Sequence, residues 1–96
     1  MSGGERPAPA AMTAAEILAG IAQVMRAHLD WRGDLAPAMR LVEDLDLDSL
    51  RRLTLAVEVE NLFRVKLEPE DEAELETIGD LVVVVQRKLA RRSRPH

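Results

Sequence analysis

The chain contains no cysteine. This absence excludes disulfides, thiolate metal sites and a cysteine nucleophile, so any thiol that this protein uses has to come from a cofactor. Long hydrophobic segments are missing too. No apolar run approaches the ~18 residues of a membrane-spanning helix, and the N-terminal residues lack the basic and apolar regions of a signal peptide. We therefore expect a cytoplasmic protein without membrane insertion.

Groups suited to catalysis are also scarce. The sequence has two histidines, His28 and His96, and neither stands at a spacing typical of a metal site or an activated nucleophile. His28 lies near the end of a predicted helix, where a histidine interacts favourably with the helix dipole. Since no acid and base pair, glycine-rich phosphate loop or metal cluster is recognisable, the sequence predicts a protein that is not an enzyme.

Charge is plentiful, and it is unevenly distributed. The net charge is −4, with fifteen acids against six bases in residues 30–80 but five bases and no acid in residues 87–94. Because an acidic body repels phosphates and attracts basic surfaces, we expect protein partners and no nucleic acid. The basic residues suit the last turn of a helix, and contact with an acidic surface is the alternative.

With 96 residues, of which 47% are hydrophobic, the chain is large enough for one small domain. Residues 1–12 are small residues with proline and glycine and show no apolar periodicity, so we predict a disordered leader. The folded domain is expected over residues 13–91, followed by a basic disordered tail at 92–96. The sequence predicts a monomer, freestanding because no catalytic domain is attached.

Apolar residues at helical spacing predict an all-α fold. The first helix covers residues 14–29, after a capping box formed by Thr13 and Glu16. A long connection follows, whose apolar residues are expected to pack over the helices, with Trp31 as an anchor. The second helix covers residues 49–63, and one broad stripe should face the core, namely Leu55, Ala56, Val59, Leu62 and Phe63.

The C-terminal third of the chain predicts two more helices. A short acidic helix is expected around residues 70–75, and Thr77 with Asp80 has the spacing of a cap that opens a last helix. The run Val82–Val85 has strand propensity and is the place where a buried strand is the alternative. The cap, the length of the periodic segment and the absence of a second strand favour a helix.

The residues between Leu41 and Leu53 read L-V-E-D-L-D-L-D-S-L-R-R-L. Asp48 is a candidate N-cap, which leaves the Ser49 hydroxyl exposed at a helix N-terminus, a place that tolerates a phosphate. Two other interpretations exist. In one, the two residues only cap a helix; in the other, the acids Asp44, Asp46 and Asp48 begin a calcium loop. The calcium interpretation requires glycine at Ser49 and glutamate at Leu55, so it is disfavoured.

The D-S-L core, and the order of helix, long loop and capped last helix over residues 13–91, resemble the phosphopantetheine attachment domain of acyl carrier proteins. The resemblance implies a small four-helix bundle of three main helices and a short acidic third helix. It also implies that a phosphopantetheinyl transferase attaches 4'-phosphopantetheine from coenzyme A to Ser49, and that acyl-loading ligases or synthases use its thiol. Asp46 stands where many relatives have glycine, and aspartate tolerates a left-handed backbone.

A second apolar stripe on the helix 49–63, formed by Leu50, Leu53 and Val57, lies beside Ser49. It either covers the loop or the third helix, or it is a partner surface, and the resemblance favours the partner surface. We assign partner recognition to Asp48, Leu50, Arg51, Leu53, Val57 and Glu60. Arg51 and Arg52 depart from the acids common in fatty-acid carriers. Arg52 can pair with Asp48 at i+4, and Arg51 is expected to select a partner of a specialised pathway.

Two other functions stay open. One is a helical interaction module in which Ser49 is unmodified. The other is a peptidyl or aminoacyl carrier, although such proteins usually have glycines and a histidine where this chain has Leu45–Asp48. The cargo can accordingly be an acyl, polyketide or aminoacyl group.

Overall fold

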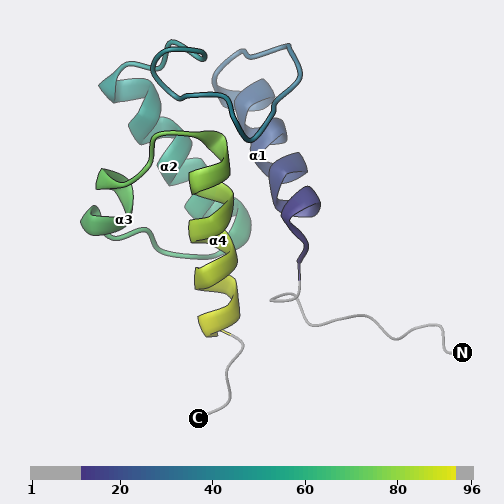
Figure 1. The fold of residues 1–96 in the computed structure, drawn as a ribbon, viewed down its shortest axis with the longest axis vertical. Coiled ribbons are helices and arrows are strands. Elements are labelled where there is room, and N and C mark those ends of the chain that lie inside the picture. Colours follow the sequence, from purple (N-terminus) through teal and green to yellow (C-terminus); the bar gives the residue numbers. More distant parts are fainter. Residues whose placement is uncertain (1–11, 93–96) are drawn as a thin grey trace, which may run out of the picture.

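The computed structural model describes residues 12–92, which form four helices (Figure 1). Helix α1 spans Ala14–His28, α2 spans Ser49–Phe63, α3 spans Pro69–Ala73 and α4 spans Ile78–Arg92. Over residues 12–92 the chain has no strand, and only an isolated bridge joins Arg40 to Thr77. The predicted all-α fold with a short acidic third helix is confirmed.

The start of α1 follows the capping-box prediction. The Glu16 amide donates to Thr13 Oγ1 at 3.1 Å, and the Thr13 amide donates to Glu16 Oε1 at 2.8 Å, so two amides without helical partners are satisfied. The helix ends at His28, one residue before the predicted end, and Leu29 is its C-cap. Its buried face packs against both α2 and α4.

Helix α2 packs its core face closely against α1. A methyl group added at Gly20 of α1 would lie 2.6 Å from Phe63 Cζ, so the Phe63 ring packs directly against Gly20 and a larger residue there would displace it. The prediction of the core stripe is wrong at Leu62, which is 45% exposed. Leu62 also reaches Gly20, with its Cδ2 3.2 Å from the position of the added methyl, and the rest of its side chain stays exposed. The other predicted core residues are buried, namely Leu55, Ala56, Val59 and Phe63.

The valine run belongs to α4, and so the helical prediction for it is confirmed. Three of its four residues are buried, namely Val82, Val84 and Val85, and Val83 is 52% exposed. A buried strand and a buried helix share this composition, and here the cap at Thr77 and Asp80 agrees with the helix.

The long connection between α1 and α2 packs over the helices, as predicted. Its buried residues include Leu41, Leu45 and Leu47, and Trp31 is half-buried against the core. Backbone hydrogen bonds fasten this connection to the start of α4: the Ile78 amide donates to Met39 O at 3.0 Å and the Gly79 amide donates to Pro37 O at 2.8 Å. The position of the segment before Ser49 is therefore set from the far end of the chain.

The predicted leader and tail fall almost entirely outside the described residues. Met12, assigned to the leader, packs partly buried against the core, and Arg92, assigned to the tail, is the last residue of α4. None of the helices over residues 12–92 is long and apolar enough to cross a membrane.

Candidate functional site

The start of α2 is capped by a single side chain. Asp48 has an extended backbone, and its Oδ1 accepts a hydrogen bond from the Arg51 amide at 2.8 Å, which confirms the predicted N-cap. Ser49, the first residue of the helix, is exposed. Within residues 12–92 its hydroxyl makes no hydrogen bond. The cap therefore leaves the Ser49 oxygen free for a covalent bond.

The turn before this cap depends on Asp46. Its φ of 56° lies in the left-handed region, as predicted for this aspartate in place of glycine. The buried side chains of Leu45 and Leu47 flank it and anchor the turn in the core. Asp46 thus reverses the chain between two anchors and brings Asp48 and Ser49 to the surface.

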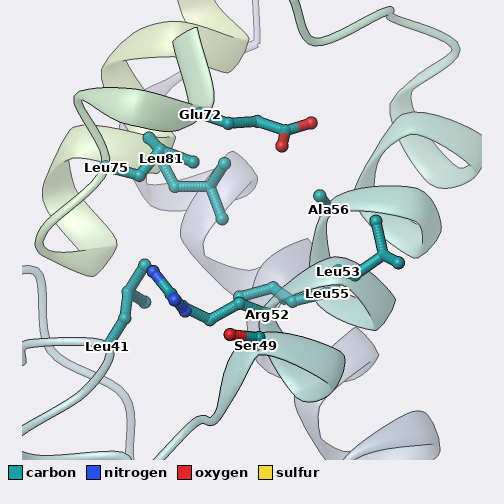
Figure 2. Close-up of a pocket in the computed structure, with 9 residues that line it drawn as sticks. All are labelled: Leu41, Ser49, Arg52, Leu53, Leu55, Ala56, Glu72, Leu75 and Leu81. Atoms are coloured by element: carbon teal, nitrogen blue, oxygen red, sulfur yellow. The ribbon is translucent and has the colours of Figure 1, made fainter. Parts of the chain in front are cut away.

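An apolar cavity of about 300 Å³ opens beside Ser49. In Figure 2 the Ser49 hydroxyl and the Arg52 guanidinium lie on the side of Leu41, and the Glu72 carboxylate lies across the cavity from them. This volume is at the lower end of the ~300–1,000 Å³ typical of ligand sites. The apolar lining consists of Leu41, Leu53, Leu55, Ala56, Leu75 and Leu81.

Sequence reasoning missed this cavity. Its lining comes from the long connection, α2, the α3 segment and α4, and no spacing within one element indicates that they meet. In the sequence these residues are indistinguishable from ordinary core residues. Helix α3, one wall of the cavity, has no buried residue of its own. It is held to α4 by an ion pair of 2.8 Å between Lys88 Nζ and Asp71 Oδ2.

The second apolar stripe of α2 is exposed. Leu50, Leu53 and Val57 are 70%, 54% and 41% exposed, and neither the long connection nor α3 covers them. Val42 in the connection is also 52% exposed. A small protein leaves such large side chains in water at a cost, and grouped exposed apolar residues commonly mark contact sites for other molecules.

Two polar residues of the predicted partner surface have other contacts. Glu60 Oε2 accepts a hydrogen bond from the Leu67 amide at 2.7 Å, so this half-buried carboxylate holds the link between α2 and α3. The predicted pair of Asp48 with Arg52 does not form, and the Asp48 carboxylate accepts the Arg51 amide. Arg51 itself is exposed, and over residues 12–92 its side chain has no ion-pair partner.

The acids before Ser49 do not converge as calcium ligands would. Asp44 Oδ2 accepts a hydrogen bond from the Arg40 amide at 2.8 Å, and Asp48 caps α2. Among the described residues no group of three acids or histidines is placed to hold a metal ion. His28 ends α1, where its Nε2 lies 3.4 Å from Glu58 Oε1 on α2.

Two aspartates near the cavity wall have lowered pKa values. The hydrogen bond from Lys88, followed by one from the Glu68 amide, lowers the pKa of Asp71. Hydrogen bonds from the amides of Glu76 and Thr77 lower the pKa of Asp80. Both carboxylates are therefore held in the charged form that fastens α3 and the start of α4.

A family model described as the phosphopantetheine attachment site matches residues 15–85 of the chain. The chain belongs to this family. Carriers of this kind hold covalently attached 4'-phosphopantetheine, and they deliver cargo to enzymes without being enzymes themselves. The match includes the cap at Asp48, the exposed Ser49 and the cavity beside it.

Relatives of this carrier include the meromycolate extension acyl carrier protein of Mycobacterium leprae, 38% identical over 78 residues, which cover 80% of this chain and 68% of that protein. The acyl carrier protein of Kineococcus radiotolerans is 34% identical over 73 residues, or 75% of this chain and 90% of that protein. A solved structure from Mycobacterium tuberculosis, assigned to the acyl carrier proteins, has a TM-score of 0.68 at 24% identity and covers 79% of this chain and 97% of that one. This last similarity supports the fold.

Proposed function

We propose that Ser49 is the attachment site of 4'-phosphopantetheine and that this protein carries an acyl group on it to successive enzymes. The observation that carries the proposal is the free, exposed Ser49 hydroxyl beside an apolar cavity, inside the segment that matches the attachment-site family. When bound, the group supplies a flexible arm whose terminal thiol can hold an acyl group as a thioester.

The residues around Ser49 fit such a group. Asp48 satisfies the amide of the first turn, so the Ser49 hydroxyl has no structural duty that a covalent bond would remove. The exposed position gives a phosphopantetheinyl transferase access to the oxygen. Buried leucines at Leu41, Leu55 and Leu81 give the cavity an apolar lining, which suits the apolar part of a cargo.

The exposed stripe of α2 supplies a surface for the enzymes that act on the arm. Leu50 and Leu53 are one and four residues beyond Ser49, so an enzyme that contacts them holds its active site close to the arm. Partners include the transferase and acyl-loading ligases or synthases. The cation Arg51 beside this stripe favours a partner with an acidic patch, which fits a specialised pathway. Relatives named for meromycolate extension support an acyl chain under elongation as the cargo.

The experiment is incubation of the full chain with coenzyme A and a promiscuous phosphopantetheinyl transferase, followed by intact-protein mass measurement. Wild type and the control Ser93→Ala should each gain the mass of one phosphopantetheine, and Ser49→Ala should gain none. Ser49→Ala should keep the thermal transition of wild type, because Asp48 still caps α2.

The outcomes separate the carrier from its alternatives. If the wild type stays unmodified, the result supports the interaction module. If Ser49→Ala gains the same mass as the wild type, the arm is attached to another residue. Loading assays on the modified protein then distinguish an acyl carrier from an aminoacyl carrier, since each loading enzyme activates only its own class of acid.

A further inference from the structure

The side chain of Arg52 is a cation without an anion. Within residues 12–92 it makes no ion pair, although its position at i+4 would allow one with Asp48. Its guanidinium also borders a second hollow that Glu43 and Glu76 line, yet no carboxylate oxygen of the described residues lies within 4.0 Å. Such a group in the first turn of a helix opposes the helix dipole, so local stability does not explain it.

Arg52 is placed next to the oxygen of Ser49. The two residues stand at i and i+3 on α2, where side chains are neighbours with Cβ atoms about 5–6 Å apart. Figure 2 shows the Ser49 hydroxyl and the Arg52 guanidinium on the same side of α2, toward Leu41, at the rim of the cavity. The neighbouring cation Arg51 does not line the cavity.

We propose that Arg52 binds the phosphodiester oxygens of the arm on Ser49 and thereby directs the arm along the rim of the cavity. This inference rests on the proposed attachment at Ser49. A guanidinium offers paired N–H donors that match two phosphate oxygens, and charge-assisted bonds of this kind are stronger than neutral ones. Attachment places an anion beside Arg52, so the unfavourable cation of the unmodified protein gains a partner once the arm is present.

The position of Arg52 gives this contact a direction. Its guanidinium lies between Ser49 and Leu41, on one edge of the cavity, so a phosphate held there starts the arm on the side of α2 that faces the cavity. Arg52 is thus a positioning residue. It would bring the cargo toward the apolar lining between visits to enzymes, and release would require the phosphate contact to break.

The test measures the phosphorus nucleus of the arm directly. Holo forms of wild type, Arg52→Gln, Arg52→Lys and the matched control Arg51→Gln are prepared with coenzyme A, and their ³¹P NMR resonances are compared with the same proteins unfolded in urea. In Arg52→Gln the resonance should move toward the unfolded position, whereas Arg51→Gln, with the same loss of charge one residue earlier, should keep the wild-type position. Arg52→Lys should restore part of the difference, because the charge returns without the paired donors.

Salt gives a second readout on the same samples. At 1 M salt the Debye length falls to about 3 Å, so the wild-type resonance should approach that of Arg52→Gln while the latter barely moves. Equal shifts for Arg51→Gln and Arg52→Gln, or none for either, would overturn the role of Arg52 while the attachment stands. If the wild type carries no phosphorus resonance after the transferase reaction, the proposed function itself has failed. Circular dichroism of each variant confirms that the fold is retained.

Discussion

Helices α2 and α4 both begin at a capping residue, yet their first turns are used differently. At α4, Thr77 Oγ1 accepts the Asp80 amide at 3.1 Å while Asp80 Oδ2 accepts the Glu76 amide at 3.0 Å and the Thr77 amide at 3.1 Å. Ile78, the first residue of α4, is fully buried. At α2, one bond to Asp48 forms the cap and Leu50 is 70% exposed.

The difference teaches that a chain can use one local signal for two purposes. The start of α4 is held by its cap, by burial and by the long connection. Gly79 lies so close to Pro37 that a methyl added at Gly79 would be 3.1 Å from the Pro37 carbonyl oxygen. The start of α2 is held by the residues that precede it in the chain, namely the cap Asp48 and the buried Leu45 and Leu47. The first arrangement serves the fold, and the second leaves a helix end accessible.

Truncating the first apolar residue of each helix tests this contrast most strongly. Ile78→Ala should reduce the free energy of unfolding by about 2–5 kcal/mol, because it opens a cavity in the core. Leu50→Ala at the start of α2 should change it by no more than about 0.5 kcal/mol. Urea titrations of both variants provide the comparison, and similar losses for the two would show that the start of α2 is also structural.

A pair of leucines distinguishes the accessible face of α2 from its core face. Leu55 is 2% exposed and Leu53 is 54% exposed, although they are two residues apart. Leu55→Ala should cost about 2–5 kcal/mol, toward the lower value because Leu55 already borders a cavity, whereas Leu53→Ala should leave the thermal transition nearly unchanged. Leu53→Ala should instead slow modification by the transferase. A large loss of stability for Leu53→Ala would assign the stripe to the core.

Acid should weaken the start of α4. The folded-state pKa of Asp80 is lowered by backbone hydrogen bonds, so the unfolded chain takes up this proton first as the pH falls below about 4. The free energy of unfolding should then decrease down to the folded-state pKa. Asp80→Asn should lose about 1 kcal/mol at pH 7 and show a flatter acid limb. The control Asp48→Asn should match wild type at pH 7, since asparagine caps as well as aspartate.

Charge reversal at Arg51 should have a small effect on stability and a selective effect on partners. An acid in the first turn of α2 interacts favourably with the helix dipole, so Arg51→Glu should gain roughly 0.3–1 kcal/mol in thermal unfolding. Loading by a dedicated ligase or synthase should become weaker, and loading by a general fatty-acid synthase enzyme should improve. Equal rates with both enzymes before and after the change would remove Arg51 from partner selection.

Local signals in the sequence predicted most of the fold. The capping residues Thr13 and Asp48 and the left-handed Asp46 each depend on neighbours within four residues, and all three are confirmed. What failed depends on competition or distance. Asp48 caps α2 without also pairing with Arg52, and Glu60 binds an amide seven residues away.

The site divides in the same way. The exposure of Ser49 follows from the N-cap Asp48 next to it, so the sequence alone is sufficient to predict it. The cavity is assembled from four segments, of which Glu72 and Leu81 come from elements far along the chain, and only their arrangement in space reveals it. Helical spacing assigns a residue to a buried face but does not say whether that face is filled.

The hydrogen bonds from Ile78 and Gly79 to the long connection also set an order of assembly. A chain that ends before α4 still contains the D-S-L sequence, but its connection lacks the two amides that bind Pro37 O and Met39 O. Contacts between segments so far apart form after local helices, because the loop between them has to close first. An enzyme that recognises the packed connection beside Ser49 would therefore modify finished molecules in preference to partly synthesised ones.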